Sequence, residues 1–209
     1  GIAEGVKAIA DAYKECVDIS KEFGQGMSNV EAIAGATSRE MSALTEEAKE
    51  LGATTKFTAR ESADAMGYMA MAGWDAQEMM SGMNGVISLA AAAGEDLAQV
   101  SDIVTDNLSA FRLTAADTAH FADVLAAAAA KSNTNISIMG ETFKSSSSVA
   151  GALGYSIEDV AVMVGLMANN AVKGSRAGTA LRNIFNGLLG GVTMTAEAFG
   201  ELDYSAVNS

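Results

Sequence analysis

Residues 70–78 of this 209-residue chain read AMAGWDAQE, and this stretch marks a joint between two helices. Gly73 can end a helix in the left-handed conformation that glycine adopts without strain. Asp75 is a favoured N-cap, and Glu78 follows it at the three-residue spacing of a capping box. Trp74 lies between the two signals. We interpret it as a hydrophobic staple that fixes the angle of the joint, with contact to a partner protein as the alternative.

The same start signal, a capping side chain followed three residues later by an acid, recurs along the chain. It is found at Thr58, Thr114 and Ser156, and Gly94 and Gly154 are further candidate helix ends. These signals predict helices over residues 59–72, 76–92, 95–110, 115–131, 136–152, 157–170 and 176–189. The starts are irregularly spaced, so they do not indicate a true repeat.

The composition favours an all-α protein. The chain has no proline, 49% of its residues are apolar and only 6% are aromatic. Its commonest residues are good helix formers, and alanine-rich cores depend on close approach of backbones. Small residues four apart, in the pairs Gly174/Gly178 and Ala126/Ala130, would permit such approach. The glycine pair straddles a predicted helix start, so we expect it to contribute less. Residues 145–148, four serines, indicate an unwound turn or an exposed face.

The first fifty residues carry a heptad pattern, which we call the heptad stripe. One of its registers holds Ile2, Ile9, Cys16, Phe23, Val30, Thr37, Leu44 and Leu51, and the other holds Val6, Tyr13, Ser20, Met27, Ala34, Met41 and Ala48. This spacing is typical of coiled coils. The phase continues through residues 24–26 (GQG), so either one long helix passes this point or two helices pair there, and we favour long helices.

The predicted architecture is therefore a segment of long heptad-patterned helices followed by a multi-helix bundle or folded helical array. We place the heptad-patterned segment at residues 1–51 and the core helical domain at residues 52–191. Residues 192–209 would form a linker or the start of another helix. The chain does not begin with Met, so we expect a piece of a longer protein.

Charge and cysteine content exclude several kinds of site. The formal net charge of −13 argues against specific binding of nucleic acid and against anionic lipid headgroups. Lys173, Arg176 and Arg182 are a local exception; they would solvate a helix end or pair with acids, with a small interaction patch as the alternative. A single cysteine, Cys16, excludes an intramolecular disulfide or a site with several thiolates.

The sequence predicts no catalytic, cofactor or metal site. Asp117, the only histidine His120, and Asp123 share a helical face, but a partly exposed face with local ion pairs explains them better than a metal site does. Glu61 and Ser62 superficially resemble the Glu-Ser pair of lytic transglycosylases, yet their neighbours indicate a capped first helical turn. No glycine-rich phosphate loop is present.

Many short phrases, in order, resemble the core region of phage tail tape-measure proteins, from about Val30 to Gly191. They are AKELG at 48–52, AMAGWD at 70–75, GEDL at 94–97, VSDIVTD at 100–106, HFAD at 120–123, NTNI at 133–136, MGETFK at 139–144, GLMANN at 165–170 and GSRAGTALR at 174–182. The chain departs from the family at Arg112, where glycine is usual. It also departs at its four serines and in lacking a proline after the last helix.

The resemblance implies a minor virion protein whose extended length sets the length of the tail tube. It also implies ejection at infection to help DNA cross the host envelope. The expected partners are the tail-tube protein, tail assembly chaperones, tail-tip proteins and further copies of the chain, without a cofactor. The expected location is the tail-tube interior of the virion, and the host bacterial cytoplasm during assembly. Host membrane contact is expected only of the full-length protein during ejection.

Two other functions remain open at this point. The alanine- and glycine-rich apolar helices suggest, as the main alternative, a membrane-active pore-forming helical protein. A cell-wall-cleaving enzyme that uses Glu61 comes third, because nothing around this residue predicts the pocket that a general acid needs.

Overall fold

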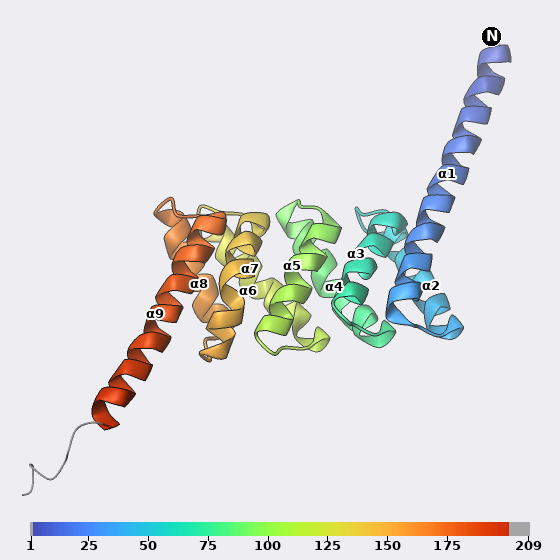
Figure 1. The fold of residues 1–209 in the computed structure, drawn as a ribbon. Helices are drawn as coiled ribbons and strands as arrows, with labels where there is room; N and C mark the ends of the chain where they lie inside the picture. Colours follow the sequence, from blue (N-terminus) through green and yellow to red (C-terminus); the bar gives the residue numbers. More distant parts are fainter. Residues whose placement is uncertain (1, 201–209) are drawn as a thin grey trace, which may run out of the picture. The chain divides into compact units, whose positions relative to one another are not determined.

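The computed structural model describes residues 2–200, and they are helical between short connections, without a strand (Figure 1). The helices are α1 (Ile2–Ala34), α2 (Ser38–Thr54), α3 (Ala59–Met71), α4 (Ala76–Ala93), α5 (Leu97–Ala110), the 3₁₀ turn η1 (Ala115–Asp117), α6 (Thr118–Ala130), α7 (Ile136–Ala152), α8 (Ile157–Asn169) and α9 (Gly174–Gly200). The all-α prediction is confirmed. The expected C-terminal segment lies partly in α9, and its residues 201–209 lie outside the described part.

Helix starts follow the predicted capping signals. The Thr58 hydroxyl accepts a hydrogen bond from the Glu61 amide, and the Glu61 carboxylate accepts one from the Thr58 amide at 2.7 Å. Asp75 and Ser156 begin α4 and α8 through equivalent capping boxes. A further box, between Thr37 and Glu40, begins α2. This start was not predicted because Thr37 also fits the heptad stripe, although its side chain is exposed.

Residues with positive φ end several helices. Gly73, Gly94 and Gly154 have φ values of +89°, +71° and +82°, as their sequence positions predict. Gly35, with φ +62°, ends α1. Arg112 has φ +59°, although it carries a side chain that clashes with the backbone in this conformation. This is the position where the tape-measure resemblance would place glycine.

We therefore expect Arg112→Gly to raise the free energy of unfolding by about 1 kcal/mol, because glycine adopts this φ without the steric penalty. Chemical denaturation followed by far-UV circular dichroism would measure the difference. Arg112→Ala is the matched control, since it removes the same long side chain and retains the Cβ. Equal stabilisation by both variants would show that backbone conformation is not the cause.

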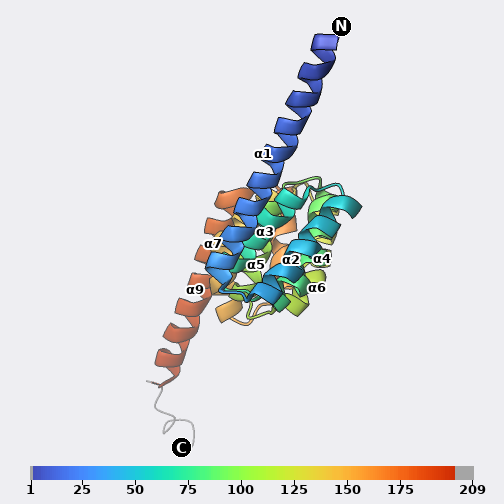
Figure 2. The ribbon, with the colours of Figure 1, turned by 90° about the vertical axis from the view of Figure 1, so that its right-hand side faces the viewer.

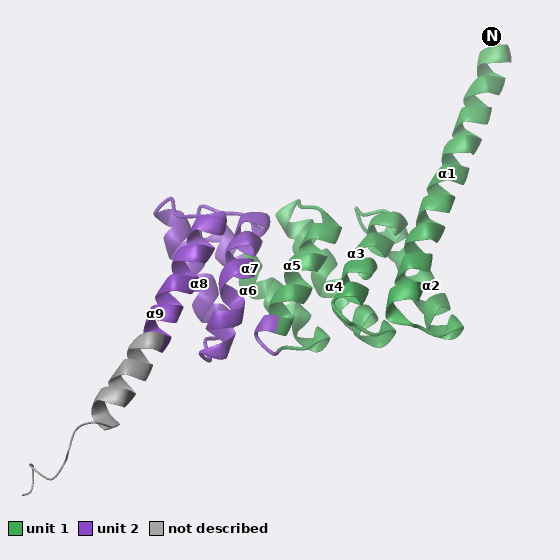
Figure 3. Ribbon diagram, in the orientation of Figure 1, with its two compact units in different colours: residues 1–109, 113–126 green, residues 110–112, 127–209 purple. Residues whose placement is uncertain are grey.

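Two compact units make up the chain (Figure 3). Unit 1 contains residues 1–109 and 113–126, and unit 2 contains residues 110–112 and 127–209. The largest fully buried side chains of unit 1 are Leu44, Met66, Met69, Met79, Met83, Leu89, Leu97, Leu108, Phe121 and Leu125, and those of unit 2 are Phe143 and Phe185. The domain boundaries after residues 51 and 191 remain predictions.

The heptad stripe is buried only in its second half. Helix α1 passes through residues 24–26 without a break, so the interpretation of one long helix at this point is confirmed. From Met27 onward the stripe joins the core of unit 1, where Val30 and Leu44 are fully buried. The first half of α1 extends beyond the other helices of this unit (Figures 1 and 2).

In unit 2, α7 and α9 approach closely through the predicted glycine pair. A Cβ atom on Gly178 would lie 2.7 Å from the Thr142 carbonyl oxygen, and the Thr142 hydroxyl donates to the Gly174 carbonyl at 3.0 Å. The expectation that this pair contributes less was wrong, because α9 begins at Gly174 and includes both glycines. In the alternative pair, Ala126 is half-buried and Ala130 is exposed.

The serine run at residues 145–148 lies inside the regular helix α7, so the expectation of an unwound turn was wrong. Ser146 and Ser147 are buried, which also contradicts an exposed face at these two positions. Their hydroxyls donate to the Thr142 and Phe143 carbonyls at 2.9 and 2.7 Å. Hydroxyl groups that donate to carbonyls of their own helix satisfy their hydrogen-bonding capacity and can be buried.

Candidate functional site

The joint at Gly73, Trp74 and Asp75 is an internal structural feature of unit 1. The Trp74 amide donates to the Met69 carbonyl at 3.0 Å, and Asp75 caps α4. The indole is only 7% exposed. It lies so close to α4 that a Cβ on Gly82 would be 2.3 Å from its Cζ3 atom. The ring contacts α4 beyond its first turn and leaves little surface for a partner protein.

The predicted cations lie in unit 2 around the start of α9. Arg176 and Arg182 are exposed, and Lys173 is half-buried. Arg182 follows Arg176 by six positions, which places the two side chains roughly 120° apart around a helix with 3.6 residues per turn. Their positions therefore do not bring the guanidinium groups together on one face.

The carboxylates considered for chemistry cap helices. The Asp117 carboxylate accepts hydrogen bonds from the Thr114 amide at 2.8 Å and its hydroxyl at 2.9 Å, and these bonds hold the pKa of Asp117 below its ordinary value. The nearby His120 contributes to the same lowering. Glu61 is engaged similarly with Thr58. Hydrogen bonds from Thr37, its amide first, likewise lower the pKa of Glu40.

The described residues contain neither a candidate metal site nor a candidate membrane-spanning helix. No group of three His, Cys, Asp or Glu side chains among them is placed where it could hold a metal ion. Within residues 2–200, no helix combines the length and apolar character needed to cross a membrane.

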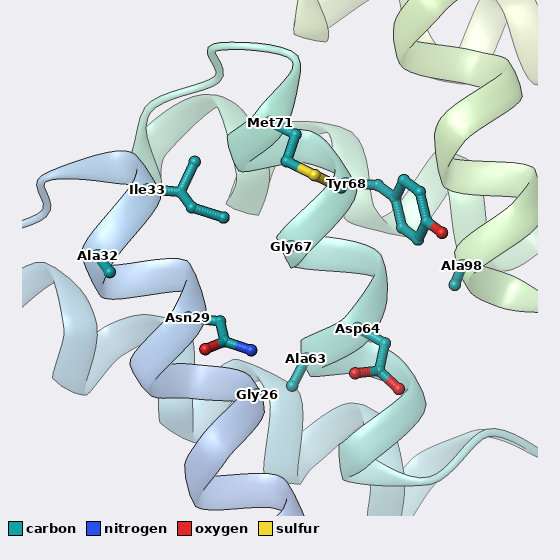
Figure 4. Close-up of a pocket in the computed structure, with 10 residues that line it drawn as sticks. All are labelled: Gly26, Asn29, Ala32, Ile33, Ala63, Asp64, Gly67, Tyr68, Met71 and Ala98. Carbon is teal, nitrogen blue, oxygen red and sulfur yellow. The ribbon is translucent and has the colours of Figure 1, made fainter.

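A groove of about 470 Å³ lies beside α1 and α3 in unit 1 (Figure 4). Gly26 lets the two helices approach, since a Cβ there would lie 3.2 Å from the Ala63 Cβ. Exposed apolar side chains of Ile33, Tyr68 and Met71 surround the groove. Asn29 and Asp64 add polar atoms, but the lining has no arrangement suited to catalysis. Sequence patterns did not predict this groove because it depends on where two helices cross.

A second groove of about 660 Å³ lies beside α1 and the start of α3. Cys16, Ile19 and Phe23 line its α1 side. An ion pair joins Arg60 to Glu22, and the Arg60 Nε atom lies 3.7 Å from Asp64. This groove runs into the uncovered half of the heptad stripe.

Several large apolar side chains are exposed on the uncovered half of α1 in unit 1. Val6 is 62% exposed, Ile9 and Tyr13 are each 73% exposed, and Ile19 is 54% exposed. Isolated surface hydrophobics are common, but a repeated set on one helix face indicates a contact surface. Heptad spacing predicts this stripe, but spacing alone does not show which half remains uncovered.

The comparisons with known proteins relate this helical chain to phage tails. The family described as phage-related minor tail protein matches residues 45–209. The tape measure protein of Pneumococcus phage Dp-1 is 43% identical over 166 residues, 79% of this chain and 14% of that protein. The probable tape measure protein of Escherichia phage P2 is 29% identical over 211 residues, 100% of this chain and 25% of that protein. The chain thus spans a quarter or less of these relatives, and no solved structure matches it.

Proposed function

Since the chain belongs to the phage-related minor tail protein family and is similar to tape measure proteins over most of its length, we propose that it forms part of a ruler that sets tail length during assembly. The observation that carries this proposal is the match to proteins named tape measure. The helical structure supports it physically, because a helix converts residue number into length at about 1.5 Å per residue. The 33 residues of α1 correspond to roughly 50 Å.

The location and partners follow from the same proposal. The full-length protein would lie inside the tail tube of the virion and would be assembled in the host bacterial cytoplasm. It would contact the tail-tube protein, tail assembly chaperones and tail-tip proteins. At infection it would leave the tube and help DNA cross the envelope. The net charge of −13 on this chain is consistent with that role, because an acidic surface repels the DNA backbone and would not bind the DNA as it passes.

We propose no catalytic role for this segment. The side chain that a cell-wall-cleaving enzyme would use, Glu61, accepts hydrogen bonds from the Thr58 amide and hydroxyl at 2.7 and 2.8 Å. A general acid needs access to its substrate, whereas the Glu61 carboxylate is engaged in capping the first turn of α3.

The ruler proposal predicts that whole heptads added to α1 lengthen the tail. Duplicating residues 3–16 in the complete protein, once and then repeatedly, preserves the heptad phase. Mean tail length should rise by about 10 Å per heptad, because each helical residue adds about 1.5 Å. Electron micrographs of tails from the series would give the slope.

A length-neutral control uses the polar face of the same helix. Asp11→Asn with Asp18→Asn changes two charges and no residue number, so tail length should stay the same. Viable phages whose tails do not change length across the duplication series would rule out a ruler function for this segment.

A further inference from the structure

The groove beside α1 and α3 has room along it for one more helix. Positions three or four residues apart on both helices line it. They are Gly26, Asn29 and Ile33 on α1, and Asp64, Gly67 and Met71 on α3. This spacing corresponds to two helical turns, about 10 Å, along each wall. Because the backbone groups of both walls bond within their own helices, side chains would recognise an occupant, as they do when a helix binds in a groove.

Gly67 leaves open space in this groove. It lies in the middle of α3, where glycine destabilises a helix relative to alanine. Some other helical glycines make room for a neighbour, as Gly82 does for Trp74. A Cβ on Gly67 would meet nothing within 4 Å, so packing inside the chain does not explain this glycine. Room for a side chain of an incoming helix would explain it.

Apolar side chains at one end of the groove are available for contact. Ile33 and Met71 lie at this end, and Gly26 and Ala63 lie at the other (Figure 4). Ile33 is 49% exposed and Met71 is 61% exposed. An apolar face of a helix in the groove would cover both side chains and remove their surface from water.

The charges around the groove are almost all negative. Within four positions of its lining residues, the only base in the sequence is Arg60, which already pairs with Glu22 and lies 3.7 Å from Asp64. The acids within the same limits are Glu22, Glu31, Glu61, Asp64, Asp75, Glu95, Asp96 and Asp102. This excess favours an occupant with lysine or arginine beside its apolar face. It disfavours a second copy of this chain, whose net charge is −13.

We propose that the groove between α1 and α3 binds a basic amphipathic helix of a partner protein. Apolar side chains of that helix, three or four residues apart, would pack over Gly67 and against Ile33 and Met71. Its lysine or arginine side chains would lie near Asp64. The binding is a property of this groove and does not depend on the ruler function.

A designed fluorescent peptide of about 18 residues, long enough to form a helix, tests the proposal. It carries leucine at every third or fourth position, lysine beside the leucines and alanine elsewhere. A second peptide replaces every lysine with glutamate. Fluorescence anisotropy with the purified 209-residue chain should show saturable binding of the lysine peptide, weaker at high salt, and no binding of the glutamate peptide.

Gly67→Leu should raise the Kd of the lysine peptide roughly tenfold or more, because the added side chain would occupy the groove. The variant should fold, since its Cβ has open space and leucine favours a helix more than glycine does. Gly67→Ala should raise the Tm by about 2–4 °C for the same reason. A lower Tm would show that folding requires this glycine and would contradict its role in binding.

Gly24→Leu is the matched control. Gly24 is an exposed residue inside α1, and a Cβ there would also meet nothing within 4 Å. It is not part of the groove lining, so the Kd of the lysine peptide should stay the same.

Each of the opposite results overturns the proposal. No binding of the lysine peptide would show that the groove does not accept a basic helix. Equal Kd values for the original chain and Gly67→Leu would place the peptide elsewhere. Equal binding of the glutamate peptide would exclude recognition by charge. Sedimentation in which Gly67→Leu weakens association of the chain with itself would make a second copy the occupant. None of these results bears on tail length, which the duplication series measures separately.

Discussion

Trp74→Ala is expected to lower the free energy of unfolding by about 3–5 kcal/mol, the usual cost of removing a large buried aromatic side chain. The indole is 7% exposed and contacts the Gly82 position of α4, where glycine leaves room for it. Alanine would leave a cavity between the α3–α4 joint and α4. Chemical denaturation followed by far-UV circular dichroism would measure the loss, since the variant has no tryptophan fluorescence.

Met71→Ala is the matched control, because Met71 lies in the last turn of α3 and is 61% exposed. It should change the free energy of unfolding by no more than about 0.5 kcal/mol. A similarly small effect of Trp74→Ala would contradict a packing role for the indole. Contact with a partner protein would then be the better interpretation of this residue.

Gly178→Val is expected to destabilise unit 2 by about 2–3 kcal/mol, in the upper part of the range for overpacking. Its Cβ would lie 2.7 Å from both the Thr142 carbonyl oxygen and the Ser145 Cβ atom. The carbonyl belongs to the backbone of α7 and cannot rotate away as a flexible side chain could. Helices α7 and α9 would have to separate, which a lower Tm and faster amide exchange in both helices would reveal.

Gly187→Ala provides the control within the same helix. A Cβ on Gly187 meets nothing within 4 Å, so alanine should stabilise α9 by up to about 1 kcal/mol through its helix propensity. If Gly178→Val also left stability unchanged or raised it, the close contact between α7 and α9 would be refuted.

Helix boundaries were predictable because their signals are local. A capping side chain and an acid three residues later satisfy amide donors within one helical turn, whatever surrounds the helix. The starts of α3, α4 and α8 were therefore readable at Thr58, Asp75 and Ser156. Positive φ at Gly73 was equally local. Thr37 was misassigned because its heptad position competed with its capping role.

The candidate contact surface was only half predictable. Heptad spacing identified the apolar stripe on α1. The same spacing gave no means of telling Ile9, which is 73% exposed, from Val30, which is fully buried. Burial depends on whether another helix reaches that part of the stripe, and α2 and α3 are too short to follow α1 along its length.

By itself, the amino-acid sequence determined that this chain is helical, where most helices begin and end, and that it resembles phage tape-measure proteins. Only the tertiary structure decided that Trp74 faces inward, that Gly178 touches the backbone of α7, and that the first half of α1 lacks a cover within its unit. Caps and periodicity act over a few residues. Burial and close approach depend on segments distant in sequence, whose positions follow from the packing of all the helices together.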